Sequence, residues 1–137
     1  MDLDRFVAAQ ATHYDGALAE LTRGAKQSHW MWFVFPQIAG LGHSATARHY
    51  AIRDIAEARA YLAHPLLGPR YLACVAALDR HRGRSAEAIM GGIDAVKLRS
   101  SLTLFDRAGA PPAVRETLDA FFPGPDDATL RLLEGQR

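Results

Sequence analysis

The stretch from Ser28 to Gln37, which reads SHWMWFVFPQ, decides how the fold is interpreted, because two tryptophans and two phenylalanines fall within six of its residues. Its aromatic and β-branched content suits a buried strand, and a short buried helix capped by Ser28 fits a run of this length equally well. Pro36 ends the element in either case. The helical pattern on both sides favours a helix, and the choice for Trp30 to Phe35 stays open from the sequence alone.

The rest of the chain has the pattern of helices. Alanine is abundant and runs of β-branched residues are nearly absent, which favours helices over strands. From Asp2 to Thr22, apolar residues recur at spacings of three and four, which marks one helical face. Helix-capping residues are expected at Ser44, Asp54, Ser85, Asp94 and Asp126 or Asp127. We therefore predict an all-α, compact, multihelical single domain of about seven to eight helices over residues 1–137.

The charge balance limits the classes of partner. Lys plus Arg is 16 and Asp plus Glu is 15, giving a net charge of +1, and 49% of the residues are hydrophobic. This near balance argues against a nucleic-acid-binding module and against a membrane-surface protein, and the longest apolar run is too short to span a bilayer. Nucleic-acid binding stays the weakest alternative, carried by arginines that would have to cluster in space. They are Arg48, Arg53, Arg59, Arg70, Arg80, Arg82 and Arg84.

Cysteine and histidine usage predicts neither a metal site nor a disulfide. Cys74 is the single cysteine and lies in an apolar helical stripe, so we expect a buried thiol in a cytoplasmic protein. None of the six histidines forms an H-x-x-x-H pair, and no Walker or G-x-S-x-G pattern is present. We expect no metal ion, and the sequence points to no cofactor.

The aromatic block carries polar side chains that suit the wall of a ligand pocket. His29 lies directly before Trp30, Lys26 precedes it, and Gln37 follows Pro36. Aromatic clusters usually form protein cores, so the simpler interpretation is packing. The alternative is a platform for a planar ligand, with polar groups around aromatic rings. Gln10, inside the apolar stripe of the first helix, is expected to form an internal hydrogen-bonded clasp or to contact the ligand.

The second block runs from Gly91 to Phe105 and predicts a helix with an inward-facing lysine. On a helical wheel, Lys97 and Ser101 fall within the apolar arc, one turn apart. Such a lysine extends to solvent, pairs with Asp94 at the i,i+3 spacing, or meets an anion. The Gly91-Gly92 pair adds a helix N-terminus suited to phosphate. The solvent face of this helix is expected to carry Arg99, Ser100, Thr103, Asp106 and Arg107.

Together the two blocks suggest a binding protein or enzyme for a small nucleotide-like or other anionic planar ligand. The residues assigned to ligand contacts are Gln10, Lys26, Trp30, Trp32, Gln37, Lys97, Ser100 and Ser101. His29 and Asp94 are the candidate catalytic residues, because imidazole titrates near neutral pH and Asp94 offers a carboxylate. This function requires one concave pocket that holds Trp30, Lys97 and Ser101 on a shared surface. The alternative is a non-catalytic interaction or structural module; the sequence predicts no oligomeric state.

Both blocks also carry a family resemblance that covers nearly the whole chain. The residues concerned include Asp4-Arg5-Phe6-Val7, the segment SHWMWFVFPQ, His64-Pro65 with Gly68 and Arg70, and KLRSSLTLF from Lys97 to Phe105. They resemble a family of small bacterial proteins classified as a domain of unknown function and sometimes labelled calpastatin. The resemblance implies a compact all-α domain and supplies no activity. Calpastatin itself is a disordered inhibitor, which does not fit this globular composition.

A more distant similarity links the chain to the YbiA-like proteins, through a helical glutamine, an aromatic-rich first half and a late lysine-bearing helix. This similarity implies N-glycosidic chemistry on nucleotide or ADP-ribose compounds. The sequence lacks the Glu-His helix of those proteins in recognisable form, so the similarity assigns no catalytic residue in this chain.

Overall fold

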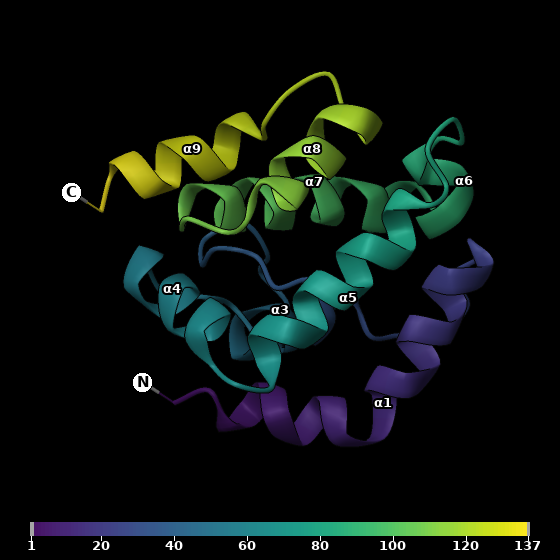
Figure 1. Cartoon of the computed structure of the whole chain (residues 1–137). Helices are drawn as coiled ribbons and strands as arrows, with labels where there is room; N and C mark the ends of the chain where they lie inside the picture. Colours follow the sequence, from purple (N-terminus) through teal and green to yellow (C-terminus); the bar gives the residue numbers. More distant parts are fainter. Residues whose placement is uncertain (1, 137) are drawn as a thin grey trace.

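Helices and connecting loops make up residues 2–136, the part of the chain that the structure, a computed structural model, describes (Figure 1). Its helices are α1 (Asp4–Arg23), α2 (Met31–Val34), α3 (Ala45–His49), α4 (Ile55–Ala63), α5 (Leu67–Asp79), α6 (Ala86–Met90), α7 (Gly92–Arg107), α8 (Pro112–Phe121) and α9 (Asp127–Glu134). The all-α prediction is confirmed. The described residues form nine helices rather than seven or eight, and three of these, α2, α3 and α6, have five residues or fewer.

Local capping signals set the start of four helices, as the sequence predicts. In each case the capping side chain accepts a hydrogen bond from the backbone N–H three residues later, which satisfies a donor that the helix itself leaves unpaired. These residues are Ser44, Asp54, Ser85 and Asp126.

The prediction that Asp94 caps its helix is wrong. α7 begins at Gly92 with Gly91 as its N-cap, and Asp94 lies inside the first turn. Gly91 has a φ of 87°, a backbone conformation that side-chain-bearing residues rarely adopt. The Asp94 carboxylate is therefore free to pair with residues outside α7.

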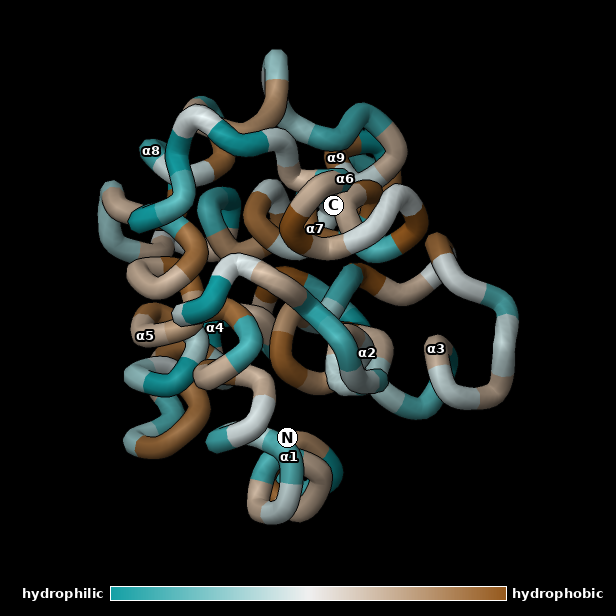
Figure 2. The backbone as a smooth tube through the Cα atoms, turned by 90° about the vertical axis from the view of Figure 1, so that its right-hand side faces the viewer, coloured by the Kyte–Doolittle hydropathy of each residue, from teal (hydrophilic) through white to brown (hydrophobic). Residues whose placement is uncertain are grey.

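The core lies between two long helices, α5 and α7. α7 packs on α4, α6, α8 and α9, while α5 packs on α1, α4 and α8. Aromatic rings fill this core: the ring centroids of Tyr71 on α5 and Phe105 on α7 are 4.4 Å apart, and those of Phe6 on α1 and Tyr61 on α4 are 5.2 Å apart. Figure 2 shows α2 between α1 and α7, so the aromatic block lies near the middle of the fold.

The aromatic block forms one turn of helix and not a strand. The backbone N–H groups of Val34 and Phe35 donate to the carbonyl oxygens of Trp30 and Met31. After Pro36 the chain extends, and Ile38 makes a single parallel bridge with Ile52. The choice between strand and helix, which the sequence left open, is therefore a helix. The block packs against neighbouring helices and does not pair with a second strand.

The solvent face expected for α7 is partly wrong. Ser100 and Thr103 are buried, because the turn before α9 covers this side of the helix. The Asp126 N–H donates to the Thr103 hydroxyl over 2.9 Å, and Arg99 Nε donates to the Gly124 carbonyl over 2.8 Å. Arg107 is exposed and Asp106 is half-buried. Among the helices of residues 2–136, none has the length and apolar character needed to cross a membrane.

Candidate functional site

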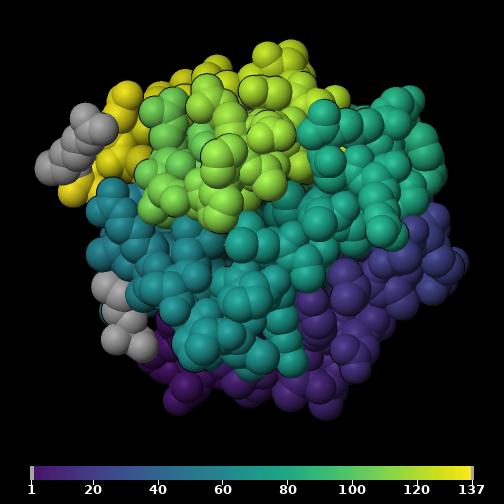
Figure 3. Space-filling model, viewed as in Figure 1, coloured from purple at the N-terminus to yellow at the C-terminus, as the bar shows by residue number. Residues whose placement is uncertain are grey.

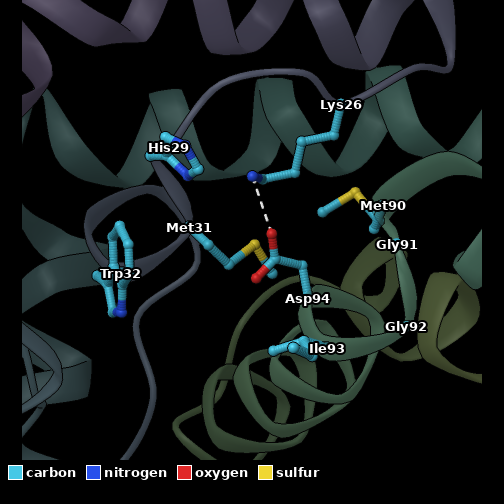
Figure 4. Close-up of a pocket in the computed structure, with 9 residues that line it drawn as sticks. All are labelled: Lys26, His29, Met31, Trp32, Met90, Gly91, Gly92, Ile93 and Asp94. Carbon is cyan, nitrogen blue, oxygen red and sulfur yellow. Dashed lines mark ion pairs between the residues drawn. The ribbon is translucent and has the colours of Figure 1, made fainter. Parts of the chain in front are cut away.

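The two sequence blocks meet at a pocket of about 330 Å³ (Figure 4). One wall comes from the loop after α1 and from α2, and the other from the junction of α6 and α7. Its lining residues are Lys26, His29, Met31, Trp32, Met90, Gly91, Gly92, Ile93 and Asp94. Residues 58 to 68 positions apart in the sequence therefore line one concave surface, which we call the Lys26 pocket.

An ion pair spans this pocket. Lys26 reaches across it, as Figure 4 shows, and its ammonium lies 2.8 Å from a carboxylate oxygen of Asp94. The same ammonium donates to the Ser28 carbonyl over 2.6 Å and lies 4.8 Å from the ring centroid of Trp30. Only 6% of the Lys26 side chain is exposed. Lys26 is thus held by an anion, a carbonyl and an aromatic face, and this contact joins the two walls.

Lys97 approaches the same carboxylate from the other side. Its ammonium lies 3.7 Å from the second oxygen of Asp94 and 4.9 Å from the ring centroid of Trp32. It is not among the lining residues, but it contacts two of them. The predicted i,i+3 pair of Asp94 and Lys97 is therefore present, but the Lys26 ammonium lies closer to the Asp94 carboxylate than the Lys97 ammonium does.

The scarcity of lysine and tryptophan is a signal in the sequence that points to this site and that the motifs above do not include. The chain has fourteen arginines and two lysines, Lys26 and Lys97, and it has two tryptophans, Trp30 and Trp32. Both lysines contact Asp94, and each lies over one of the two indole rings. Lysine is a compact charge with three donors, unlike the planar arginine fork. Because both lysines of an arginine-rich chain lie beside Asp94, the surroundings of Asp94 are the best candidate for a functional site.

Glu20 fixes the loop that carries Lys26 and His29. Its carboxylate accepts hydrogen bonds from the Gln27 and Ser28 backbone N–H groups, at 2.6 and 2.9 Å, from the Ser28 hydroxyl, and from the Trp30 indole N–H at 3.0 Å. Burial raises the pKa of Glu20, but these hydrogen bonds outweigh it and bring the pKa to about 2. Sequence analysis did not single out Glu20, although the unpaired indole N–H of Trp30 required an acceptor.

Four of the sequence-assigned residues lie on the pocket wall. Lys26 lines it from the loop after α1, Trp32 from α2 and Asp94 from the first turn of α7. His29, also in the lining, is exposed. In Figure 4, His29 lies beside Trp32, and both are on the far side of the Lys26 ammonium from Met90. Lys97 adds a fifth assigned residue beside them.

The other assigned residues lie elsewhere. Trp30, Ser100 and Ser101 are buried, and Ser101 shares a hydrogen bond of 2.9 Å with the Tyr71 hydroxyl. Gln37 is half-buried and, together with Trp32, lines a separate small depression. A surface shared by Trp30, Lys97 and Ser101 is therefore not formed, and the pocket version that needs those three residues is wrong. Trp32, and not Trp30, is the tryptophan that lines the pocket.

Gln10 forms the internal clasp. Its amide nitrogen donates to the Phe33 carbonyl over 2.7 Å and to the Tyr61 hydroxyl over 3.0 Å, while 2% of the residue is exposed. It therefore joins α1 to the aromatic block and α4 and lies outside the lining of the Lys26 pocket.

Neither metal-ligand nor thiol chemistry is set up within residues 2–136. No group of three or more His, Cys, Asp or Glu side chains there is placed to hold a metal ion. Burial raises the pKa of the Cys74 thiol to about 12, which keeps it protonated and unreactive. The charged groups at the Lys26 pocket are instead suited to noncovalent recognition of an anion, through two ammonium groups and the N-terminus of α7.

Comparison with known proteins gives a consistent result. The chain is similar to the crystal structure of the conserved hypothetical protein Rv1873 from Mycobacterium tuberculosis, with 47% identity and a TM-score of 0.95, covering 97% of this chain and 96% of that chain. No curated protein matched the chain. Residues 1–133 match the family described as "Protein of unknown function (DUF1810)". This match takes in almost every residue, including both sequence blocks, and the chain therefore belongs to the DUF1810 family.

Proposed function

We propose that the Lys26 pocket binds a small anionic ligand with a planar ring, of the nucleotide class. One observation carries the proposal: both lysines of the chain converge on the Asp94 carboxylate, and each lies over an indole ring, Lys26 over the buried Trp30 and Lys97 over Trp32 of the pocket lining. Two ammonium groups against one carboxylate leave a surplus of one positive charge. An anionic group of a ligand would share the lysines with Asp94 and complete this charge balance.

The start of α7 adds donors on the same wall. The N–H groups in the first turn of a helix have no partner within the helix, and the helix dipole places positive charge there. Gly91 and Gly92 carry no side chains that would cover this end, and both line the pocket. A phosphate beside Gly92 would thus meet backbone N–H groups while it approaches the Lys26 and Lys97 ammonium groups.

An apolar part of the pocket suits a ring. Trp32, Met31 and Met90 contribute aromatic and thioether surface to the lining, and Trp32 is half-buried. Methionine and tryptophan side chains bind flat aromatic surfaces well. If the bound ligand is also converted, His29 and Asp94 are the groups placed to move a proton.

The proposal is tested by a thermal-shift series with ADP, AMP, adenosine and inorganic phosphate. We expect ADP to raise the melting temperature more than adenosine or phosphate alone. Lys97→Ala and His29→Ala should reduce the shift, whereas Lys97→Arg should retain part of it. Arg131→Ala, an exposed position on α9, is the matched control and should behave like the unmodified protein. No shift with any compound, or equal shifts in Lys97→Ala and the control, would contradict the proposal.

A specific observation also supports the alternative of an interaction module. Ile93 and Val96 are the large hydrophobic residues of the described chain that stand exposed, at 78% and 63%. Both lie in the first two turns of α7, where Ile93 lines the Lys26 pocket and Val96 does not. Ile93→Ser with Val96→Ser should leave ADP-dependent thermal shifts intact if these residues serve a protein partner, and should abolish them if they close over the ligand.

A cytoplasmic, single-domain protein that acts on a small molecule rather than on nucleic acid is part of the same proposal. The near-zero net charge and the single buried, unpaired Cys74 support it. One continuous hydrophobic cluster, drawn from α1 to α8, supports a single domain.

A further inference from the structure

A second cavity, of about 340 Å³, lies apart from the Lys26 pocket and shares no residue with it. It is lined by Ile55, Arg59, Arg107, Leu130, Leu133, Glu134 and Gln136. Figure 1 places α4 and α9 at the left of the view, with α6 and the end of α1 at the right, and Figure 3 shows the yellow surface of α9 directly above that of α4. We call this cavity the Arg59–Arg107 pocket.

The fold holds the walls of this pocket in place. α4 and α9 both pack on α7, and Arg107, the last residue of α7, lines the cavity together with residues of these two helices. Beyond α9, the side-chain amide of Gln136 donates to the Arg53 carbonyl over 2.9 Å. This bond ties the end of the chain to the segment before α4. The cavity is therefore bounded by elements that are fixed relative to one another.

The apolar lining is incompletely covered by protein. Leu130 and Leu133 of α9 line the cavity, yet both are only half-buried, and so is Ile55 on α4. Aliphatic side chains on a core-facing helix surface are normally buried. Three branched aliphatic side chains thus face the cavity and leave apolar surface for a ligand, and no aromatic residue lines it.

The polar lining has a surplus of guanidinium groups. Arg59 and Arg107 are both exposed, and within residues 2–136 neither guanidinium group makes an ion pair or a hydrogen bond, while those of Arg5, Arg53 and Arg99 do. Glu134 is the one carboxylate of the lining, so the lining carries a net charge of +1. Guanidinium groups bind carboxylates through two parallel hydrogen bonds. The charge and the donors fit a monoanion.

We propose that the Arg59–Arg107 pocket binds an aliphatic monocarboxylate, a short or medium-chain fatty acid in chemical terms. The carboxylate lies on Arg59 and Arg107, and the hydrocarbon chain lies along Ile55, Leu130 and Leu133. The volume is at the lower end of the ~300–1,000 Å³ usual for small-molecule sites. A dianion such as phosphate would leave one charge unmatched and would not use the apolar wall.

The test is a titration of the full chain with sodium octanoate, followed by amide chemical shifts in ¹H–¹⁵N NMR spectra. Octanol, which has the hydrocarbon chain without the charge, and inorganic phosphate, which has charge without a hydrocarbon chain, are titrated for comparison. We expect saturable shifts confined to α4, the end of α7 and α9 with octanoate. Octanol and phosphate should give much weaker responses at the same concentrations.

Variants identify the contacts. Arg59→Gln and Arg107→Gln replace exposed side chains, so the fold should be retained. Each should raise the dissociation constant for octanoate at least fivefold. Arg131→Gln, on the outer face of α9, is the matched control and should bind like the unmodified protein. Leu130→Phe keeps both arginines but narrows the apolar wall, and should weaken octanoate more than butyrate. Shifts that do not saturate, that lie at the Lys26 pocket, or that are equal in both arginine variants and the control would overturn the assignment.

Discussion

The Lys26 ammonium lies 2.8 Å from a carboxylate oxygen of Asp94 and joins the loop after α1 to the first turn of α7, 68 positions later in the sequence. The contact determines the shape and the charge of the Lys26 pocket. Because Lys97 shares the same carboxylate, a change at Asp94 should affect both stability and anion affinity, in opposite directions.

Replacing Asp94 separates these two effects. Asp94→Asn leaves a nearly buried lysine without its counter-ion, and should lower the free energy of unfolding by about 1–2 kcal/mol. The same change adds one positive charge to the pocket, so the affinity for ADP should rise severalfold. Urea unfolding and calorimetric titration measure the two quantities.

The matched control for this variant is Asp119→Asn on α8, whose carboxylate is 62% exposed and lies 3.8 Å from Arg115. Exposed ion pairs contribute little, so its free energy of unfolding should change by less than about 0.5 kcal/mol. Weaker binding of ADP to Asp94→Asn would show that the carboxylate itself contacts the ligand.

Glu20 should contribute a pH-dependent part of the stability. Its pKa in the folded protein is about 2, below the ordinary value of 4.5, so the unfolded chain binds the proton more tightly. The stabilisation is therefore fully present above about pH 4.5 and is lost as the pH falls toward 2.

Glu20→Gln should thus lower the free energy of unfolding by about 2 kcal/mol at pH 7. It should also make this free energy less dependent on pH between 5 and 3. Urea unfolding at pH 7, 4 and 3 measures this difference, with the exposed Glu116→Gln as the control. A parallel decline of Glu20→Gln and the unmodified protein across this range would contradict the role given to Glu20.

Gln10 should matter for stability and not for the ligand. Gln10→Ala removes donors to the Phe33 carbonyl and the Tyr61 hydroxyl in the core, and should lower the free energy of unfolding by about 2–3 kcal/mol. Gln27→Ala, an exposed amide on the loop, should have little effect. Loss of ADP binding at temperatures where Gln10→Ala is still folded would restore Gln10 as a ligand contact.

Cys74 should react only when the protein unfolds. Burial raises the pKa of its thiol to about 12, so thiolate is scarce and the sulfur lies within the core. At pH 8, labelling by a disulfide reagent should be at least about 100-fold slower in the native protein than in 6 M guanidinium chloride. Rapid labelling of the native protein would show that the α5 region opens readily.

Four helix starts could be predicted from the sequence because their causes are local. Ser44, Asp54, Ser85 and Asp126 act on N–H groups three residues away, and such pairs are visible in the sequence. Asp94 has the same local pattern but pairs with Lys26, a residue that no local pattern brings near it. The cap was mispredicted for that reason.

The candidate site was predicted as two blocks, but not residue by residue. Trp30 and Trp32 are equivalent in the sequence, but the Trp30 indole is buried and donates to the Glu20 carboxylate, while Trp32 lines the pocket. Ser100 was placed on an exposed face because the turn before α9 that covers α7 lies more than twenty residues further along the chain. The scarcity of lysine was visible in the sequence and would have identified both ammonium groups.

The most direct measurement is NMR of protein labelled with ¹³C only in lysine, which gives two sets of side-chain signals, one from Lys26 and one from Lys97. Lys26→Arg and Lys97→Arg assign them. During a titration with ADP, both sets should shift and saturate with the same dissociation constant, because both ammonium groups lie against the Asp94 carboxylate of the Lys26 pocket. ADP that binds while both sets stay unchanged, or that produces no saturable shift at millimolar concentration, would contradict a shared anion site at Lys26, Asp94 and Lys97.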